Sequence, residues 1–165
     1  MRWPFSRRTK PSPPAKMPDL RGVTLTEEEH QECQAFMTSM IPPSDEGQRV
    51  MRGDLVEPYK RNLVAMCLMG RAKRFAILAR TQRQFRAKAC EAAAKACAVY
   101  PLSAYFYDFA CILDELGEEQ EATVMLANFL RRHEAEPVNE VDKVALNERD
   151  VTTMVRQAKE RLNLP

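Results

Sequence analysis

The chain has 165 residues, a formal net charge of +2 and a hydrophobic content of 45%. That length is enough for one sizeable hydrophobic core, so we expect one folded domain. A charge so close to zero gives no overall attraction to nucleic acid or membrane, and any electrostatic function has to be local. The longest apolar run, residues 63–69, is too short to cross a bilayer. With only five glycines, the chain contains no glycine-rich phosphate-binding loop.

The first 22 residues form a basic, proline-rich segment. They hold six basic residues, five of the eleven prolines and one acid, Asp19. The prolines oppose a regular helix, and no apolar core follows the charges as a secretory signal requires. We therefore expect a disordered tail over residues 1–22 and an α-helical domain over residues 24–163. A targeting or binding role for the tail stays open.

A first helix is predicted after Thr26, because Thr26 and Glu29 have the spacing of a capping box. Its apolar stripe consists of Cys33, Phe36, Met37, Met40 and Ile41. The prolines at 42 and 43 are expected to end it. A second helix is predicted from Pro58, a residue suited to the first helical position. The pattern leaves open whether this helix ends at Gly70 or continues to Arg80.

An alanine-rich stretch, residues 87–98, has strong intrinsic helix propensity and little side-chain bulk. Thr81 and Gln84 have the spacing of a second capping box before it, which favours a break near Arg80. Further along the chain, apolar residues recur at three- and four-residue steps over residues 103–116. This period indicates another helix with one buried face.

Gly117 is suited to the C-terminal cap of that helix, because glycine adopts a positive φ without steric cost. A second helix follows, on which Ala122 is small enough to let the two helices approach closely. Together the two segments predict an antiparallel helical hairpin. Near the end of the chain, Asn147 is the expected cap of a final helix. Its apolar face is predicted to consist of Val151, Met154, Val155, Ala158 and Leu162.

Two of these helical segments repeat at a spacing of 33 residues, from Ala89 to Ala122. Counted from Ser103, positions 4, 7, 8, 11, 15, 20 and 24 are Phe106, Phe109, Ala110, Leu113, Gly117, Ala122 and Leu126. A preceding unit, counted from Gly70, matches in its second half through Ala89, Ala93, Ala96 and Pro101. The pattern resembles the tetratricopeptide repeat, a helix-turn-helix unit of about 34 residues. The resemblance implies an all-α fold of antiparallel helical hairpins, stacked as a short array with a C-terminal capping helix.

The resemblance also implies a binding scaffold rather than a catalyst, with a groove lined by the first helix of each unit. The groove positions carried over to this chain are Arg71, Arg74, Leu78, Thr81 and Gln82, then Ala104, Tyr107, Cys111, Asp114 and Glu115. Leu78 and Cys111 are explained equally well as core residues. We therefore expect a protein-interaction module that holds a peptide or a partner helix. Its expected partner-binding residues are Arg71, Arg74, Ala104, Tyr107, Asp114 and Glu115.

Residues that usually carry catalysis or bind metals are sparse in this chain. The five cysteines have no CxxC spacing and lie within apolar helical patterns. Buried thiols of this kind are typical of a reducing compartment, which predicts a cytoplasmic protein. His30 and His133 have no nucleophile nearby in a recognisable turn. We expect no enzymatic activity, no cofactor and no metal site.

An alternative function is binding to RNA or DNA phosphates through a basic run. Between residues 71 and 95 there are eight basic residues and a single acid, Glu91. The basic residues are Arg71, Lys73, Arg74, Arg80, Arg83, Arg86, Lys88 and Lys95. Single-strand binding proteins also stack bases on aromatic side chains, and this run offers Phe75 and Phe85. Such binding would weaken steeply as salt rises.

Overall fold

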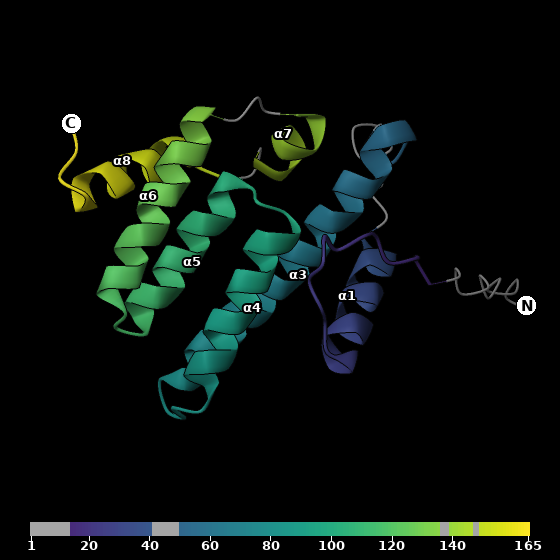
Figure 1. The fold of residues 1–165 in the computed structure, drawn as a ribbon, viewed down its shortest axis with the longest axis horizontal. Helices are drawn as coiled ribbons and strands as arrows, with labels where there is room; N and C mark the ends of the chain where they lie inside the picture. The colour runs from purple at the N-terminus through teal and green to yellow at the C-terminus, as the bar shows by residue number, and fades with distance from the viewer. Residues whose placement is uncertain (1–13, 41–49, 136–138, 147–148) are drawn as a thin grey trace, which may run out of the picture.

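The computed structural model describes residues 14–40, 50–135, 139–146 and 149–165 (Figure 1). Within these ranges it contains seven α-helices, one 3-10 helix and no β-strand. The elements are α1 (Glu27–Ser39), the 3-10 helix η1 (Gly53–Leu55), α3 (Val56–Ala79), α4 (Phe85–Val99), α5 (Ser103–Glu115), α6 (Glu119–Ala135), α7 (Glu140–Leu146) and α8 (Val151–Arg161). The all-α prediction is confirmed for this part of the chain.

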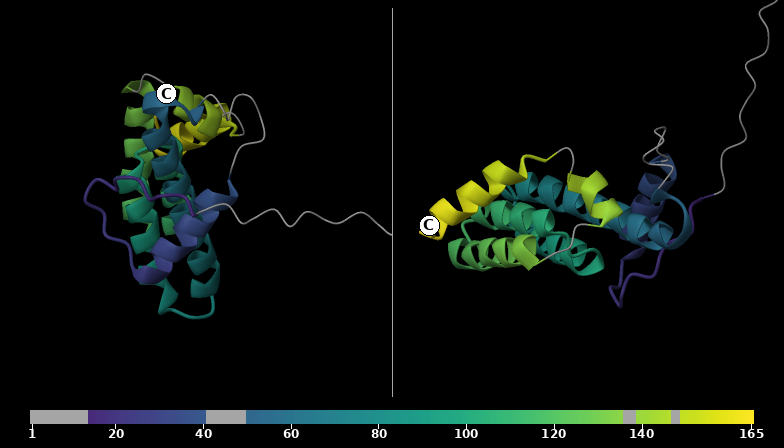
Figure 2. Two further views of the ribbon diagram at one scale, coloured as in Figure 1. Left: turned by 90° about the vertical axis from the view of Figure 1, so that its right-hand side faces the viewer. Right: turned by 90° about the horizontal axis from the view of Figure 1, so that it is seen from above.

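Two antiparallel helix pairs form the centre of the molecule. α3 packs along α4, α5 packs along α6, and α4 also contacts α5, so the pairs lie side by side (Figure 1). α1 packs on α3 at one end of this array, and α8 packs on α5 and α6 at the other (Figure 2). The short helix α7 contacts α3. The chain therefore forms the expected hairpin, α5 with α6, a second antiparallel pair before it, and one helix that covers each end.

Small side chains allow the pairs to come close together. The alanines Ala89, Ala92, Ala93 and Ala96 on α4 are at most 1% exposed. Ala110 of α5 and Ala122 of α6 are fully buried as well. Because an alanine occupies little space beyond the backbone, α4 can pack against α3 on one side and α5 on another. The buried position of Ala122 agrees with its predicted place between paired helices.

Two of the predicted local signals are confirmed. The Thr26 hydroxyl accepts the Glu29 backbone N–H at 3.2 Å, and a Glu29 carboxylate oxygen accepts the Thr26 N–H at 2.8 Å, which completes the capping box of α1. At the end of α5, Gly117 has a φ of +77°. The Glu118 N–H donates to the Leu113 carbonyl at 2.9 Å, the bond of a Schellman motif. The chain thus reverses between α5 and α6.

The expected capping box before α4 is wrong. α3 continues through Gly70 to Ala79, and α4 begins only at Phe85, without a side-chain cap at Gln84. The Thr81 hydroxyl instead donates to the Leu78 carbonyl at 3.3 Å, and the Gln84 amide donates to the Gln82 side chain at 3.3 Å. Both side chains are engaged within the turn, so neither reaches the start of α4. The predicted break near Arg80 is confirmed.

The last helix has a cap three residues later than expected. The Asp150 carboxylate accepts the Thr153 N–H at 3.0 Å at the start of α8, whereas Asn147 lies outside the described residues. Met154 and Ala158 of the predicted apolar face are buried. Ile41, the last residue of the apolar stripe predicted for the first helix, lies outside the described residues. So do the prolines at 42 and 43, which are expected to end that helix. α1 itself ends at Ser39.

The segment before α1 runs along that helix without regular secondary structure. The Ala15 N–H donates to the Thr38 hydroxyl at 3.1 Å, and the Gln34 amide donates to the Ala15 carbonyl at 3.3 Å. Pro18 is buried. Residues 1–13 of the expected tail lie outside the described part of the chain, and the tail boundary at residue 22 stays a prediction. Across the described helices, none is long and apolar enough to cross a membrane.

Candidate binding cleft

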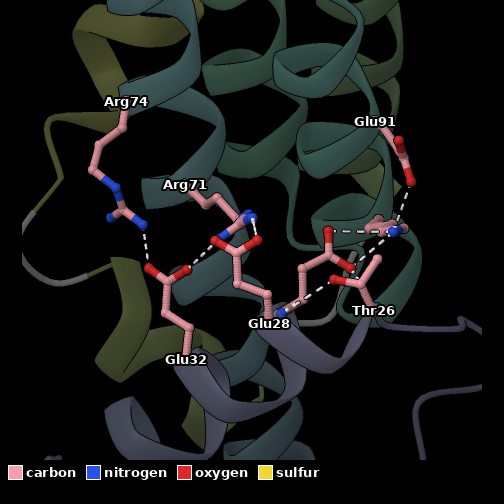
Figure 3. Close-up of polar contacts among 8 residues, drawn as sticks. Thr26, Glu28, Glu32, Arg71, Arg74 and Glu91 are labelled. Carbon is pink, nitrogen blue, oxygen red and sulfur yellow. Dashed lines mark hydrogen bonds and ion pairs between the residues drawn. The ribbon is translucent and has the colours of Figure 1, made fainter. Parts of the chain in front are cut away.

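The two arginines predicted to line a groove lie under α1. Arg71 forms ion pairs with Glu28 at 3.1 Å and with Glu32 at 2.7 Å, and Arg74 also pairs with Glu32 (Figure 3). The Arg71 side chain is only 11% exposed. These contacts hold α1 against α3. Arg71 therefore meets a partner only where α1 moves aside, while Arg74 reaches solvent beside it.

Three of the predicted residues on α5 contact the core or α8. Ala104 is fully buried. The Tyr107 hydroxyl is hydrogen-bonded to Gln157 of α8, and the Tyr107 ring meets Phe129 edge-on, with the ring centroids 5.4 Å apart. Asp114 accepts two hydrogen bonds from the Arg161 guanidinium, one of them at 2.5 Å. In this structure Tyr107 and Asp114 bind α8 to the preceding helix pair.

An open cleft lies between the regions that α1 and α8 cover. It has a volume of about 490 Å³ and separates the second half of α3 from α5. Its walls consist of Lys73, Ala76, Ile77 and Arg80 on α3, and of Asp108, Cys111, Ile112 and Glu115 on α5. Ala76 and Ile112 are buried, but Ile77 is 58% exposed. An aliphatic side chain therefore stands open to solvent beside an apolar floor.

Two sets of ion pairs border this apolar strip. Lys73 lies 3.2 Å and Arg149 lies 2.9 Å from the same oxygen of Asp108, and Arg80 lies 3.0 Å from Glu115. The side chain of Asp108 is 11% exposed, whereas those of Lys73 and Arg80 are 50% and 62% exposed. The cations and Glu115, which is 46% exposed, thus reach the mouth of the cleft, while Asp108 lies at its base.

The expected and observed linings overlap on α5 but not on α3. Cys111 and Glu115 line the cleft as the resemblance implied. On α3 the cleft contains Lys73, Ile77 and Arg80, each one residue before an expected position. One residue turns a helix by about 100°, so the expected face of α3 points partly toward α1 instead. The unpredicted Ile77 had one signal in the sequence, a pair of adjacent aliphatic residues between basic ones.

Cys111 differs from the expectation that the cysteines are buried. Cys33, Cys67 and Cys97 are buried, but Cys111 is exposed in the cleft. Partial burial and the nearby carboxylates of Asp108 and Asp114 raise the pKa of the Cys111 thiol. A raised pKa disfavours the thiolate that a nucleophile or metal ligand needs. Within the described ranges, no three His, Cys, Asp or Glu side chains are placed to hold a metal ion.

A second hollow, of about 350 Å³, lies where the start of α1 meets α3 and α4. Two of its lining carboxylates, Glu29 and Glu91, pair with Lys95 of α4 at 2.9 Å and 2.8 Å. Phe75 and Phe85 stack on each other beside it, with centroids 5.6 Å apart. Three of its acids, Glu28, Glu29 and Glu91, thus hold cations of α3 and α4, and the hollow is smaller than the cleft between α3 and α5.

Over the described residues, these features define an all-α protein of packed antiparallel helix pairs with an open cleft between α3 and α5. In comparisons with known proteins, the chain matches no protein-family model, no curated protein and no solved structure.

Proposed function

We propose that this protein is a non-catalytic protein-interaction module, a scaffold or adaptor whose cleft between α3 and α5 binds a peptide or a helix of a partner. The observation that carries this proposal is the exposed Ile77, which stands beside the buried Ile112 and between two sets of ion pairs. An apolar centre with a charged rim is the usual composition of a protein-binding site. The cleft volume of about 490 Å³ is enough for a few anchoring side chains.

The resemblance to the tetratricopeptide repeat supports the same function. We match α3 with α4 and α5 with α6 to two helix-turn-helix units, of which the first, counted from Gly70, begins within α3, and α8 follows as a final helix. In the resembled family the first helices of successive units line the binding groove. Here those helices are α3 and α5, and the cleft lies between them. α1 and α8 restrict access at either side, so the proposed binding surface is short.

Binding to nucleic acid is the weaker alternative. Six of the eight basic residues between 71 and 95 form ion pairs with acids, namely Arg71, Lys73, Arg74, Arg80, Arg86 and Lys95. The stacked rings of Phe75 and Phe85 are covered by the ammonium group of Lys88, which lies 5.9 Å and 5.4 Å from their centroids. Paired charges and covered rings leave fewer groups for phosphates and bases.

Replacing Ile77 with Asp tests the proposed function. Ile77 is exposed, so the substitution places a charge in the cleft without removing a core side chain. A matched control is Val124→Asp on α6, where the side chain is 55% exposed and lies outside the cleft. Wild-type protein and both variants are immobilised, exposed to native cell lysate, and compared by quantitative mass spectrometry.

We expect at least one protein to be retained by the wild type and the Val124 variant and reduced about tenfold or more by Ile77→Asp, as for a central anchor. Circular dichroism checks that both variants are folded. Identical retention by all three proteins would contradict the proposed site. RNA that is retained equally by the two variants and lost at high salt would favour the alternative.

A further inference from the structure

The shape of the cleft restricts how a partner segment can bind. Both walls are helices, and the described residues contain no β-strand whose edge could pair with an extended peptide. The lining also contains no aromatic side chain of the kind that binds proline-rich segments. A groove with helical walls and an apolar floor fits the mode in which a helix places aliphatic side chains into it. The partner segment that fits these walls is an amphipathic helix, if the proposed function holds.

Donors exceed acceptors among the hydrogen-bonding groups that stay available at the cleft mouth. Asp108 already accepts from both Lys73 and Arg149 and is itself buried. Glu115 accepts from Arg80 through one oxygen and is 46% exposed, so it keeps part of its acceptor capacity. That bond uses one Nη atom, and a guanidinium carries five N–H groups, so Arg80 keeps donors that face solvent. An ammonium group likewise has three N–H groups, and the half-exposed Lys73 keeps donors beyond its contact with Asp108.

The chain on the α3 side of the cleft is basic, whereas α5 and the turn after it carry acids. From residue 71 to residue 90 the chain contains seven basic residues and no acid. This stretch includes the cleft side of α3, the turn after it and the start of α4. Although several of these cations pair with acids of α1, α5 and the α5–α6 turn, Arg74 and Arg80 are more than half exposed. Carboxylates on a partner would therefore meet charge of the opposite sign on this side of the cleft.

We propose that the cleft between α3 and α5 binds an acidic amphipathic helix, with an aliphatic side chain against Ile77 and Ile112 and carboxylates near Lys73 and Arg80. This inference deepens the proposed function and rests on it. Charge complementarity selects an acidic segment over a basic one, and the apolar strip provides the anchor.

A selection from a random peptide library tests the proposal without assuming a partner. A display library of helix-favouring peptides, balanced in acidic and basic residues, is selected on the immobilised full-length protein. Enriched peptides are then synthesised and titrated against wild type, Ile77→Asp, and the double variant Lys73→Gln with Arg80→Gln. Val124→Asp is the control for a surface charge elsewhere. Peptides in which every Asp and Glu is replaced by Lys are titrated alongside.

We expect the enriched peptides to carry aliphatic residues at helical spacing and an excess of acids. Their binding should be lost with Ile77→Asp and unchanged with Val124→Asp. Neutralising Lys73 and Arg80 should weaken them about three- to tenfold, as for two exposed charge pairs, and should remove the preference over the Lys-substituted peptides. Cleft-binding peptides without an acidic preference would overturn this inference and leave the proposed function standing. Failure to enrich any peptide sensitive to Ile77→Asp would overturn both.

Discussion

The contact between Glu29 and Lys95 allows a sharp test of how α1 is held on the helix pairs. The Lys95 ammonium group lies 2.9 Å and 3.2 Å from the two Glu29 carboxylate oxygens, and 2.8 Å from Glu91. The side chains of Glu29 and Lys95 are only 7% and 15% exposed. Glu29→Gln keeps the shape of the side chain and its capping bond to Thr26, because glutamine also forms a capping box. The substitution therefore removes mainly the charge.

The expected loss of stability follows from these contacts. A hydrogen bond to a charged group contributes about 1.5–3 kcal/mol. Lys95 keeps its pair with Glu91 in the variant, so we expect a cost near the lower end, about 1–2 kcal/mol at neutral pH. The control is Glu91→Gln. The Glu91 side chain is 63% exposed and pairs with Lys95 one helical turn away, and such pairs contribute about 0.2–0.5 kcal/mol.

The pH dependence provides a second measurement on the same variant. Burial raises the pKa of Glu29, but the hydrogen bonds from Lys95 and the Thr26 N–H outweigh it and bring the pKa below the ordinary value of 4.5. A lowered pKa in the folded state stabilises the protein above the unfolded-state value, and this contribution is lost as the pH falls through the folded-state pKa. The difference between wild type and Glu29→Gln should stay constant above about pH 5 and shrink below about pH 4.5.

Urea unfolding followed by far-UV circular dichroism, repeated from about pH 7 down to the acid limit of the fold, measures both effects. Equal midpoints for wild type and Glu29→Gln at neutral pH would refute the reasoning. A difference that persists undiminished in acid would show that the charge of Glu29 is not its source.

Two further predictions concern packing and thiol chemistry. Ala122 of α6 is fully buried in the pair that α6 forms with α5. Ala122→Trp should overpack this contact and lower the free energy of unfolding by roughly 1–3 kcal/mol or more, far more than Glu119→Gln on the same helix. Denaturant melts measure this, and equal stability of the two variants would contradict the assigned helix contact. A disulfide reagent should label Cys111 first, because it is exposed. Cys97 should react only on unfolding, since burial, with Asp108 nearby, raises the pKa of its thiol to about 12. Cys111→Ser should remove the fast labelling phase, and a fast phase that survives this substitution would count against the described surface.

Local interactions explain which parts of the fold could be predicted from the sequence. The capping box of Thr26 and Glu29 and the turn at Gly117 form between residues at most five positions apart. The helical period of the apolar residues depends on the same short range, and so does the low bulk of the alanine-rich helix. The all-α class and the hairpin over residues 103–135 follow from signals of this kind. The box expected at Thr81 and Gln84 failed because other local partners within the turn compete for both side chains.

The surroundings of the candidate site depend on contacts between distant parts of the chain. Arg71 meets Glu32, 39 residues earlier, and Tyr107 meets Gln157, 50 residues later. These contacts join the central pairs to α1 and α8, and they leave Ile77 and Cys111 as the open lining between α3 and α5. A residue pattern states which side chains share a helix face, but the face that stays open depends on where other helices pack. The sequence by itself therefore determined most of the helices and the turn at Gly117, because these depend on short-range contacts, and the tertiary structure decided where the cleft lies.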